Sequence, residues 1–227
     1  MDRDFSRGLD MFNPDNHKDI KIGIIWAWGI GSNSAYCLAK MGLKLKVCDF
    51  DEVDTVNTSS QFYGLKDLGK PKVEQLRENI KAMCDEEIEI INDKYNPDDF
   101  KDCQILVLAL DSLKVRKEVV ETCDDNTFIL DTRMVKKSVV VNTLYGFQRD
   151  TWIEKERDEK ADEEAWWTRC TEKAICYNAL GMAYLVGLLI TDYLKILEWG
   201  EQAQEILPIK YTYALDGKNR VLHTFSD

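Results

Sequence analysis

The sequence lacks several patterns that define common protein classes. It has no pair of cysteines separated by two residues, which argues against a zinc ribbon, and we expect no zinc. Its seven cysteines are odd in number and mostly lie in apolar stretches, which indicates free thiols in a reducing, cytoplasmic compartment. There are only four prolines, and no internal repeat or low-complexity tract interrupts the chain. A single folded domain is the simplest expectation.

Two further absences bear on partners. The chain opens on "MDRDFSRG" without an apolar leader, and its longest apolar run, "ALGMAYLVGLLI" at 179–190, is shorter than a membrane-spanning helix requires. We therefore expect no membrane association. Basic residues are outnumbered: 30 Lys and Arg against 41 Asp and Glu give a formal net charge of −11. Because such a surface repels phosphate backbones, general nucleic-acid binding is not expected.

Apolar, strand-like runs alternate with helical patterns through most of the chain. The patterns predict strands over 20–25, 44–49, 88–92, 104–110, 127–131 and 136–145, and helices over 31–41, 70–84, 112–123 and 173–199. Near-continuous apolar strands separated by helices are typical of a parallel sheet covered on both faces. The predicted fold class is α/β: a Rossmann-like, doubly wound, mainly parallel sheet. An Asp-Gly pair between two β-rich runs near the C-terminus adds a β-hairpin extension.

The turn after the first predicted strand is where a nucleotide-binding unit places small residues. In a dinucleotide fingerprint one glycine makes the turn, a second lets the backbone approach phosphate, and a third lets the helix pack on the strand. These places hold Trp26, Trp28 and Gly31, with Gly29 also small. Asp49, eighteen residues after Gly31, lies at the distance typical of a ribose-binding carboxylate, although an Asp at a strand end is also ordinary turn chemistry.

The stretch "VCDFDEVDTVNTSSQFYGLKDLGKPKVEQLRENI" resembles the ThiF/MoeB superfamily, which includes the ubiquitin-activating enzymes. Members have a strand ending in Asp-x-Asp, then an Asn, then a Gln, and a Gly-x-Pro-Lys that opens a helix. These elements stand here as Asp49 and Asp51, Asn57, Gln61, and Gly69 to Lys72. The stretches "LVLALDSLKVRKEV", "ILDTRM" and "RCTEKAICYNALGMAYLVGLL" resemble later segments of small, single-domain bacterial and phage members. The resemblance covers about residues 5–200.

The resemblance implies an adenylyltransferase that binds ATP and Mg²⁺ and activates the C-terminal carboxylate of a ubiquitin-like or sulfur-carrier protein. It implies one ThiF-like adenylation domain over 1–227, with an N-terminal arm (1–19), a nucleotide-binding core (20–145), a charged crossover segment (150–170) and a long helix plus hairpin (173–227). Relatives are usually homodimers, and a homodimer is expected. The residues implied at the nucleotide are Gly29, Gly31, Asp49, Asp51, Asn57, Gln61 and Lys72.

The resemblance also implies roles for individual residues inside and outside that set. Lys72 would neutralise phosphate charge, and Asp111 would hold Mg²⁺ through its oxygens. Arg7, in "DFSRGLDMF", matches an arginine that reaches a dimer partner's site. Cys170, near the start of the long helix and beside Arg169, is the candidate thioester nucleophile. Each residue also has a structural alternative. Lys72 could be a surface lysine and Asp111 a helix N-cap. Arg7 could be a terminal residue without a role, and Cys170 a structural cysteine.

Two departures from the family pattern put activity in question. Many members carry an arginine directly before the Gln of the second motif, where this chain has Ser60. The pattern at 26–31 is Gly-x-Gly-Gly-x-Gly in the family and "WAWGIG" here. A bulky residue held at positive φ costs roughly 1–2 kcal/mol. An indole at position 28 would also sit at the helix N-terminus that otherwise receives phosphate.

The sequence leaves the activity of this chain open. The leading prediction is ATP-dependent adenylylation with ATP binding impaired by Trp26 and Trp28. The alternative is a catalytically inactive protein, either a pseudoenzyme or an engineered variant, that acts as a dimeric protein-binding module. Indoles that swing outward and stack on the base are a third explanation of the two tryptophans. A nicotinamide-dependent oxidoreductase is disfavoured by Lys72 and Asp111 at their spacings and by the missing glycines.

Overall fold

The computed structural model describes residues 3–135, 138–145, 148–155, 175–199, 212–216 and 221–225. The strands are β1 (Lys21–Ile25), β2 (Lys44–Cys48), β3 (Glu89–Ile91), β4 (Ile105–Leu108), β5 (Phe128–Val135), β6 (Ser138–Leu144), β7 (Thr212–Asp216) and β8 (Val221–Phe225). The α-helices are α1 (Gly29–Lys40), α2 (Lys72–Cys84), α3 (Leu113–Thr122), α4 (Gln148–Lys155) and α6 (Cys176–Trp199). Short 3-10 helices are η1 (Pro14–His17), η2 (Thr55–Ser59), η3 (Leu65–Asp67) and η4 (Pro97–Phe100).

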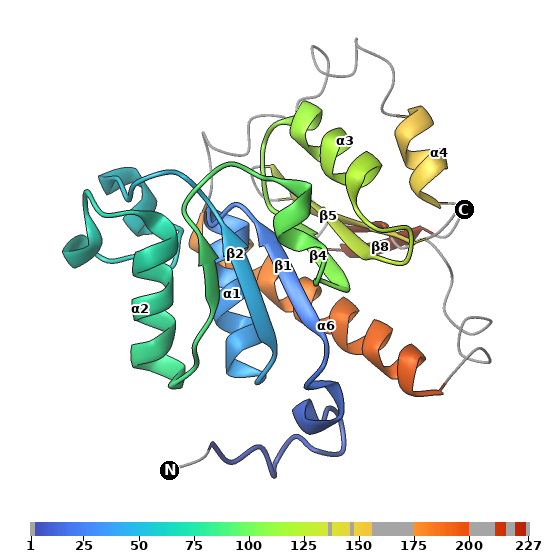
Figure 1. Cartoon of the computed structure of the whole chain (residues 1–227), viewed down its shortest axis with the longest axis horizontal. Coiled ribbons are helices and arrows are strands. Elements are labelled where there is room, and N and C mark those ends of the chain that lie inside the picture. The colour runs from blue at the N-terminus through green and yellow to red at the C-terminus, as the bar shows by residue number, and fades with distance from the viewer. Residues whose placement is uncertain are drawn as a thin grey trace.

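The strands form one sheet in the order β3-β2-β1-β4-β5-β6-β7-β8. The pairs from β3 to β5 are parallel, and those from β5 to β8 are antiparallel. The chain leaves β1 for α1 on one face and β4 for α3 on the other (Figure 1). Between two such neighbouring strands the connecting loops diverge, which opens a crevice at their carboxyl ends.

The sheet divides the apolar core into two layers. Ile22 and Ile24 of β1 point into a cluster with residues of α1, α2 and α6. Ile25 and Leu106 point into a second cluster with residues of α3 and α4. This alternation follows from the period of two along a strand, and it places helices on both faces of the sheet (Figure 1).

The predicted fold class is therefore confirmed, including the C-terminal hairpin formed by β7 and β8. Each predicted helix is present within three residues of its expected bounds. Strand β5 continues beyond the predicted end at 131 because Thr132 to Val135 pair with β6 in a long hairpin. Helix α4 was not expected, since its segment is polar and its two large apolar residues, Trp152 and Ile153, are adjacent and give no helical period.

Helix α6 packs closely against α1. A Cβ added at Gly187 would lie 3.5 Å from Sδ of Met41 on the C-terminal end of α1. By length and composition alone, Cys176–Glu198 would suffice to cross a membrane, with a mean hydropathy of 1.6. A core helix of a soluble domain has the same properties, and Met182 and Ile190 are fully buried in this one.

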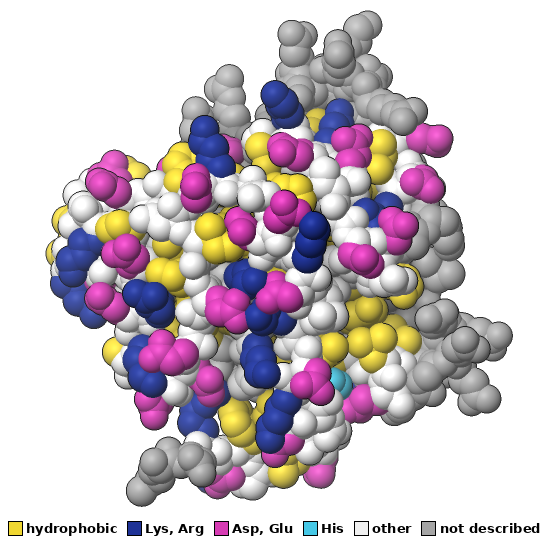
Figure 2. Space-filling view, in the orientation of Figure 1, with side chains coloured by type: hydrophobic (Ala, Val, Ile, Leu, Met, Phe, Trp, Pro, Cys, Tyr) yellow, Lys and Arg dark blue, Asp and Glu magenta, His cyan; other side chains and the backbone are white. Residues whose placement is uncertain are grey.

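Charges of both signs are interspersed on the face seen in Figure 2. Lys21, at the start of β1, and Lys46, in the middle of β2, are both ion-paired with Asp102, each at 2.6 Å, and with Glu89 at 2.5 and 3.4 Å. Hydrogen bonds from Lys21 to Asp102 and Glu89 raise the pKa of Lys21. These pairs join the first three strands at the end of the sheet opposite the crevice.

Asp131 on β5 is the centre of a buried polar cluster. It accepts hydrogen bonds from Arg116 of α3, Arg133, Asn142 of β6 and Trp152 of α4. Burial by itself would raise the pKa of Asp131, but the charges of Arg133 and Arg116 and the bonds from Arg133 and Asn142 outweigh burial and lower it to about 2. Asp131 is therefore ionised, and it fixes two elements from one face to the centre of the sheet.

Gly31, in the first turn of α1, has no room for a side chain. A Cβ there would lie 1.8 Å from the carbonyl oxygen of Trp26 and 3.2 Å from Cβ of Ala109. We predict that Gly31→Ala lowers the free energy of unfolding by about 3 kcal/mol or more, because backbone must move. Urea denaturation at pH 7 measures this. The matched control is Gly181→Ala on α6, where nothing lies within 4 Å and alanine should stabilise by about 0.5–1 kcal/mol.

We predict that Asp131→Asn destabilises the protein by about 3–5 kcal/mol at pH 7, because it leaves two arginines without their buried carboxylate. Since folding lowers the pKa of Asp131, its stabilising contribution is present above pH 4 and is lost as the pH falls towards 2. Urea denaturation from pH 6 to 2 should therefore show the native protein and the variant converging at acid pH. Asp98→Asn, in an exposed pair with Lys101, should change stability by less than about 0.5 kcal/mol. Parallel pH profiles for native and Asp131→Asn proteins would contradict the assignment.

Candidate functional site

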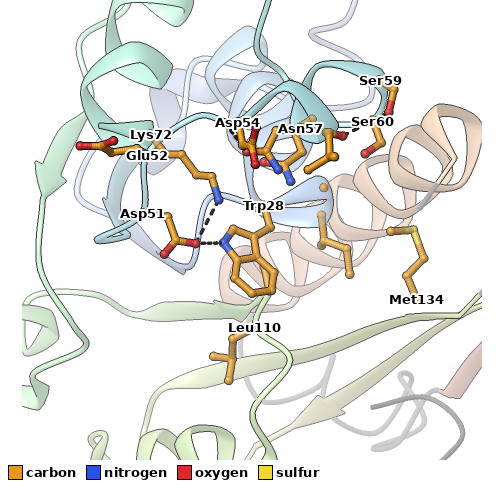
Figure 3. A pocket seen from close by; sticks show the side chains of 15 residues that line it. Trp28, Asp51, Glu52, Asp54, Asn57, Ser59, Ser60, Lys72, Leu110 and Met134 are labelled. Atoms are coloured by element: carbon orange, nitrogen blue, oxygen red, sulfur yellow. Dashed lines mark hydrogen bonds and ion pairs between the residues drawn. The ribbon is translucent and has the colours of Figure 1, made fainter. Parts of the chain in front are cut away.

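A cavity of about 610 Å³ opens at the carboxyl ends of β1 and β4, where the connections to α1 and α3 diverge. Its wall comes from the N-terminus of α1, the stretch from 51 to 61 that contains η2, the start of α2 and the end of β4 (Figure 3). The lining residues are Trp28, Gly29, Ile30, Asp51, Glu52, Asp54, Val56, Asn57, Ser59, Ser60, Gln61, Lys72, Ala109, Leu110 and Met134.

The turn from 26 to 28 is held by bonds on both of its edges. Trp26 has φ 76°, in the left-handed region, so a residue other than glycine stands where the chain needs positive φ. The Ala27 amide donates to Oδ2 of Asp49 at 2.8 Å, and the Tyr63 hydroxyl donates to the Ala27 carbonyl at 2.9 Å. These contacts fix the direction in which α1 starts.

The two tryptophans of this turn point to different places. Trp26 is only 8% exposed, packs edge-on against Phe50 at 5.6 Å and belongs to the apolar cluster beneath α3 and α4. It does not line the cavity. Trp28 lines the cavity and is half-buried. Of the two substitutions in the family pattern, only the one at position 28 places an indole in the cavity.

Trp28 lies across the charged pair of the site (Figure 3). Its indole Nε1 donates to Oδ2 of Asp51 at 2.8 Å, and Nζ of Lys72 donates to the same oxygen at 3.1 Å. The Lys72 ammonium also lies 5.1 Å from the centroid of the indole ring, in cation–π range. The side chain of Lys72 is 4% exposed, so its charge is covered and already partnered.

The first turn of α1 faces the cavity through Gly29 and Ile30. Trp28 is the N-cap residue, and among the described residues no side chain caps the helix, so its positive end is available to an anion. Ser32 and Asn33 anchor this turn from below. The Ser32 hydroxyl donates to the Trp28 carbonyl and accepts from the Phe62 amide, while Asn33 donates to the carbonyls of Gly29 and Ser60.

The two aspartates of the Asp-x-Asp motif have different environments. Asp49 is fully buried, and its oxygens accept from the amides of Ala27 and Asp51 at 2.8 Å each. Burial raises the pKa of Asp49, partly offset by the Asp51 amide and the charge of Lys72. Asp51 lines the cavity with a side chain that is 30% exposed. Of the two predicted carboxylates, that of Asp51 lines the cavity, whereas that of Asp49 lies beneath the turn and is bonded to the Ala27 amide.

Asn57 and Gln61 both line the cavity, as does Ser60, which stands where many relatives carry arginine. The Asn57 side chain accepts from the Asp54 amide at 2.8 Å and so closes the start of η2. The Oε1 atom of Gln61 is buried and has no hydrogen-bond partner in the described part of the chain. A buried acceptor of this kind favours a ligand that brings a donor.

Asp111 and Arg7, which were also predicted at the site, are not part of the cavity wall. Asp111 directly follows Leu110, which does line it. Arg7 is exposed on the N-terminal arm, whose Arg3 donates to the Lys40 carbonyl at 3.2 Å at the far end of α1. Since α1 has 12 residues, it spans about 18 Å between that contact and the cavity. Cys170 lies outside the described residues.

The residues present fit a nucleotide in part. A helix N-terminus and a lysine suit phosphate, and an exposed carboxylate suits ribose hydroxyls, but the Trp28 indole covers the lysine. No group of three metal-ligating side chains was found in the described ranges. Mg²⁺ does not require one, since it usually binds through one or two carboxylates together with substrate phosphates. Asp51, Glu52 and Asp54 line the cavity, and Asp111 directly follows the lining residue Leu110.

Ser32, Asn33 and Tyr63 were not identified from the sequence. Their side chains fix the turn and the start of α1 without touching the cavity. Small polar residues in a first helical turn are common, and a tyrosine after the Gln motif gives no signal of its own. Only the folded path of the chain brings Tyr63 under Ala27.

Comparison with known proteins places this geometry among relatives. Among curated proteins, ubiquitin-like modifier-activating enzyme 5 of Caenorhabditis briggsae is 29% identical over 147 residues, covering 63% of this chain and 32% of that protein. Among solved structures, PaaA superposes with a TM-score of 0.70 at 16% identity, covering 94% of this chain and 65% of that one. E. coli MccB with ATP gives 0.67 at 19% identity, covering 94% and 64%.

The chain thus spans about a third of the curated relative and just under two thirds of the PaaA and MccB chains. The structural matches establish a shared fold, and the order of Asp51, Asn57, Gln61 and Lys72 around one cavity accords with the motifs of the sequence. The ThiF family model matches residues 10–218, nearly the whole sequence, and this protein therefore belongs to the ThiF family.

Proposed function

We propose that this protein is an ATP-dependent adenylyltransferase that activates the C-terminal carboxylate of a ubiquitin-like or sulfur-carrier protein. The observation that carries the proposal is the meeting of the α1 N-terminus, Lys72 and Asp51 at one cavity between β1 and β4. Support also comes from family membership, from a relative named as a ubiquitin-like modifier-activating enzyme, and from MccB, which was solved with ATP and, in another crystal, with AMPCPP and MccA.

The cavity residues have complementary roles in this reaction. The amides of Gly29 and Ile30 and the ammonium of Lys72 would hold phosphate oxygens, and Asp51 would accept from ribose hydroxyls. A carboxylate oxygen of the carrier attacks the α-phosphorus; the new O–P bond forms as the bond to pyrophosphate breaks. Lys72 stabilises the negative charge that gathers on the phosphate oxygens. Mg²⁺, held by Asp111, would neutralise the leaving pyrophosphate.

A second candidate function is a catalytically inactive, dimeric binding module. The observation that favours it is the position of Trp28, which covers Lys72 and shares its carboxylate partner. ATP binding is then impaired by Trp28, whereas Trp26 acts on the turn conformation alone. The two candidates differ in a single measurable respect, which is turnover of ATP in the presence of a carrier carboxylate.

We further propose a homodimer in a reducing, cytoplasmic compartment, with α6 in the interface. Tyr177, Leu180 and Tyr184 lie on one stripe of α6 and are 54%, 51% and 64% exposed. Residues three and four apart share a helix face, so these side chains form a continuous apolar surface. Apolar surfaces of this kind commonly mark protein–protein contacts.

The test of catalysis is pyrophosphate–ATP exchange with a ubiquitin-like carrier, on the native protein and on Trp28→Gly. We expect exchange that is weak in the native protein and stronger in Trp28→Gly. Lys72→Met in either background should lower the rate of exchange on the order of 100-fold, because the positive charge that stabilises the phosphate oxygens is lost. The same carrier with an amidated C-terminus is the control and should give none. If Trp28→Gly binds the carrier but neither binds ATP nor exchanges pyrophosphate, the binding-module function holds.

The dimer is tested by sedimentation velocity on Leu180→Glu, Tyr184→Glu. Introducing two like charges into an apolar interface should raise the dimer dissociation constant on the order of 100-fold or more, so the variant should sediment as a monomer. Met83→Glu, at an exposed apolar position on α2, serves as the control and should leave the dimer intact. If the double variant still sediments as a dimer, α6 does not form the interface.

A further inference from the structure

The indole of Trp28 is held by contacts that a bound ligand would have to replace. One oxygen of Asp51 accepts from both the indole N–H and the Lys72 ammonium, at 2.8 and 3.1 Å. The ammonium in turn lies 5.1 Å from the indole centroid. The three groups therefore satisfy one another, and the charges of Asp51 and Lys72 are paired while the indole is in place (Figure 3).

The side chain of Trp28 can leave this position without unfolding the turn. Its backbone is fixed as the N-cap of α1, since its carbonyl accepts from the amide and the hydroxyl of Ser32 at 2.9 and 2.6 Å. The indole itself is half-buried and packs only at the edge of an apolar cluster. Trp26, buried within that cluster, has no such freedom.

We propose that the Trp28 indole is a reversible latch over Lys72, held closed by its contacts with Asp51 and Lys72. The latch opens when a ligand takes the place of the indole at both residues. The proposal rests on the nucleotide-binding function proposed above and adds how the ligand gains access. A nucleoside phosphate carries hydroxyl donors for Asp51 and anionic oxygens for Lys72. A simple polyphosphate pairs with Lys72 but leaves Asp51 without a donor and facing negative charge.

The latch has a thermodynamic signature. If the indole moves before an anion reaches Lys72, as the latch requires, opening weakens the binding of every such ligand by the same factor. Ligands that contact Lys72 alone then bind more weakly than a nucleotide, which also supplies a partner for Asp51. An indole that instead stacked on the base would strengthen nucleotides selectively, so its removal would weaken ATP and leave a polyphosphate unaffected.

The experiment compares Mg²⁺–ATP and Mg²⁺–tripolyphosphate by calorimetry on the native protein, Trp28→Phe and Trp28→Gly. Trp28→Phe keeps a ring but loses the N–H that binds Asp51. We expect both ligands to bind more tightly to it by a similar factor, on the order of tenfold, which corresponds to one hydrogen bond. Trp28→Gly should gain at least as much. Unchanged affinity in both variants, or a loss confined to ATP, would overturn the latch.

Trp152→Phe is the matched control, because Trp152 also donates its indole N–H to an aspartate, Asp131, at 3.1 Å, but lies outside the cavity. It should leave both affinities unchanged.

A ligand-free measurement separates the latch from the proposed function. Acylation of Lys72 by a small amine-directed reagent, followed by mass spectrometry, should be several-fold faster in Trp28→Phe and Trp28→Gly than in the native protein and in Trp152→Phe. Equal rates in all four proteins would refute the latch whatever the nucleotide data show. Faster acylation without ATP binding in any variant would uphold the latch over Lys72 and refute the nucleotide function.

Discussion

The close approach of Gly31 to the Trp26 carbonyl is the constraint on which the rest of the site depends. With no room for a Cβ between them, α1 must start directly over the end of β1. That path forces positive φ at Trp26, and it leaves Trp28 as the N-cap with its indole over the cavity. Asp49 and Tyr63 then hold Ala27 from either edge, so the amides of the first helical turn face one fixed direction.

The buried charges on the other face of the sheet support the same cavity. Arg116 of α3 pairs with Asp131 and also donates to the carbonyls of Leu108 and Leu110. Leu110 forms part of the cavity wall, and Asp111 follows it. One guanidinium, with several donors in a fixed plane, thus ties the end of β4 to β5, and a lysine could not make all these bonds at once. The wall opposite Lys72 is rigid for this reason.

Much of the fold could be predicted from the sequence because apolar period and turn chemistry are local. The strand order and the crevice follow once the parallel α/β pattern is recognised. The direction of individual side chains could not be predicted. Which of Trp26 and Trp28 enters the cavity depends on the backbone angles of one turn, where Gly31 approaches the Trp26 carbonyl and Ala109, distant in sequence, lies close to Gly31. Likewise, a motif identifies Asp49 and Asp51 together, but only the folded chain shows that Asp49 is bonded to the Ala27 amide beneath the turn while Asp51 lines the cavity.

The two tryptophans therefore differ in kind, although the sequence presents them as equivalent losses of glycine. At Trp26 the cost of a positive φ is offset by burial of the indole, which packs against Phe50 and does not reach the cavity. Trp28 is accommodated by the polar groups of the site itself, because its N–H meets Asp51 and its ring meets Lys72. The cavity is present beside the indole, and the hydrogen bonds of Ser32 and Asn33 hold the first turn of α1 at its wall. An indole that merely filled a disused cleft would require no such partners, whereas one that contacts the lysine predicted to bind phosphate competes with any anion for that lysine.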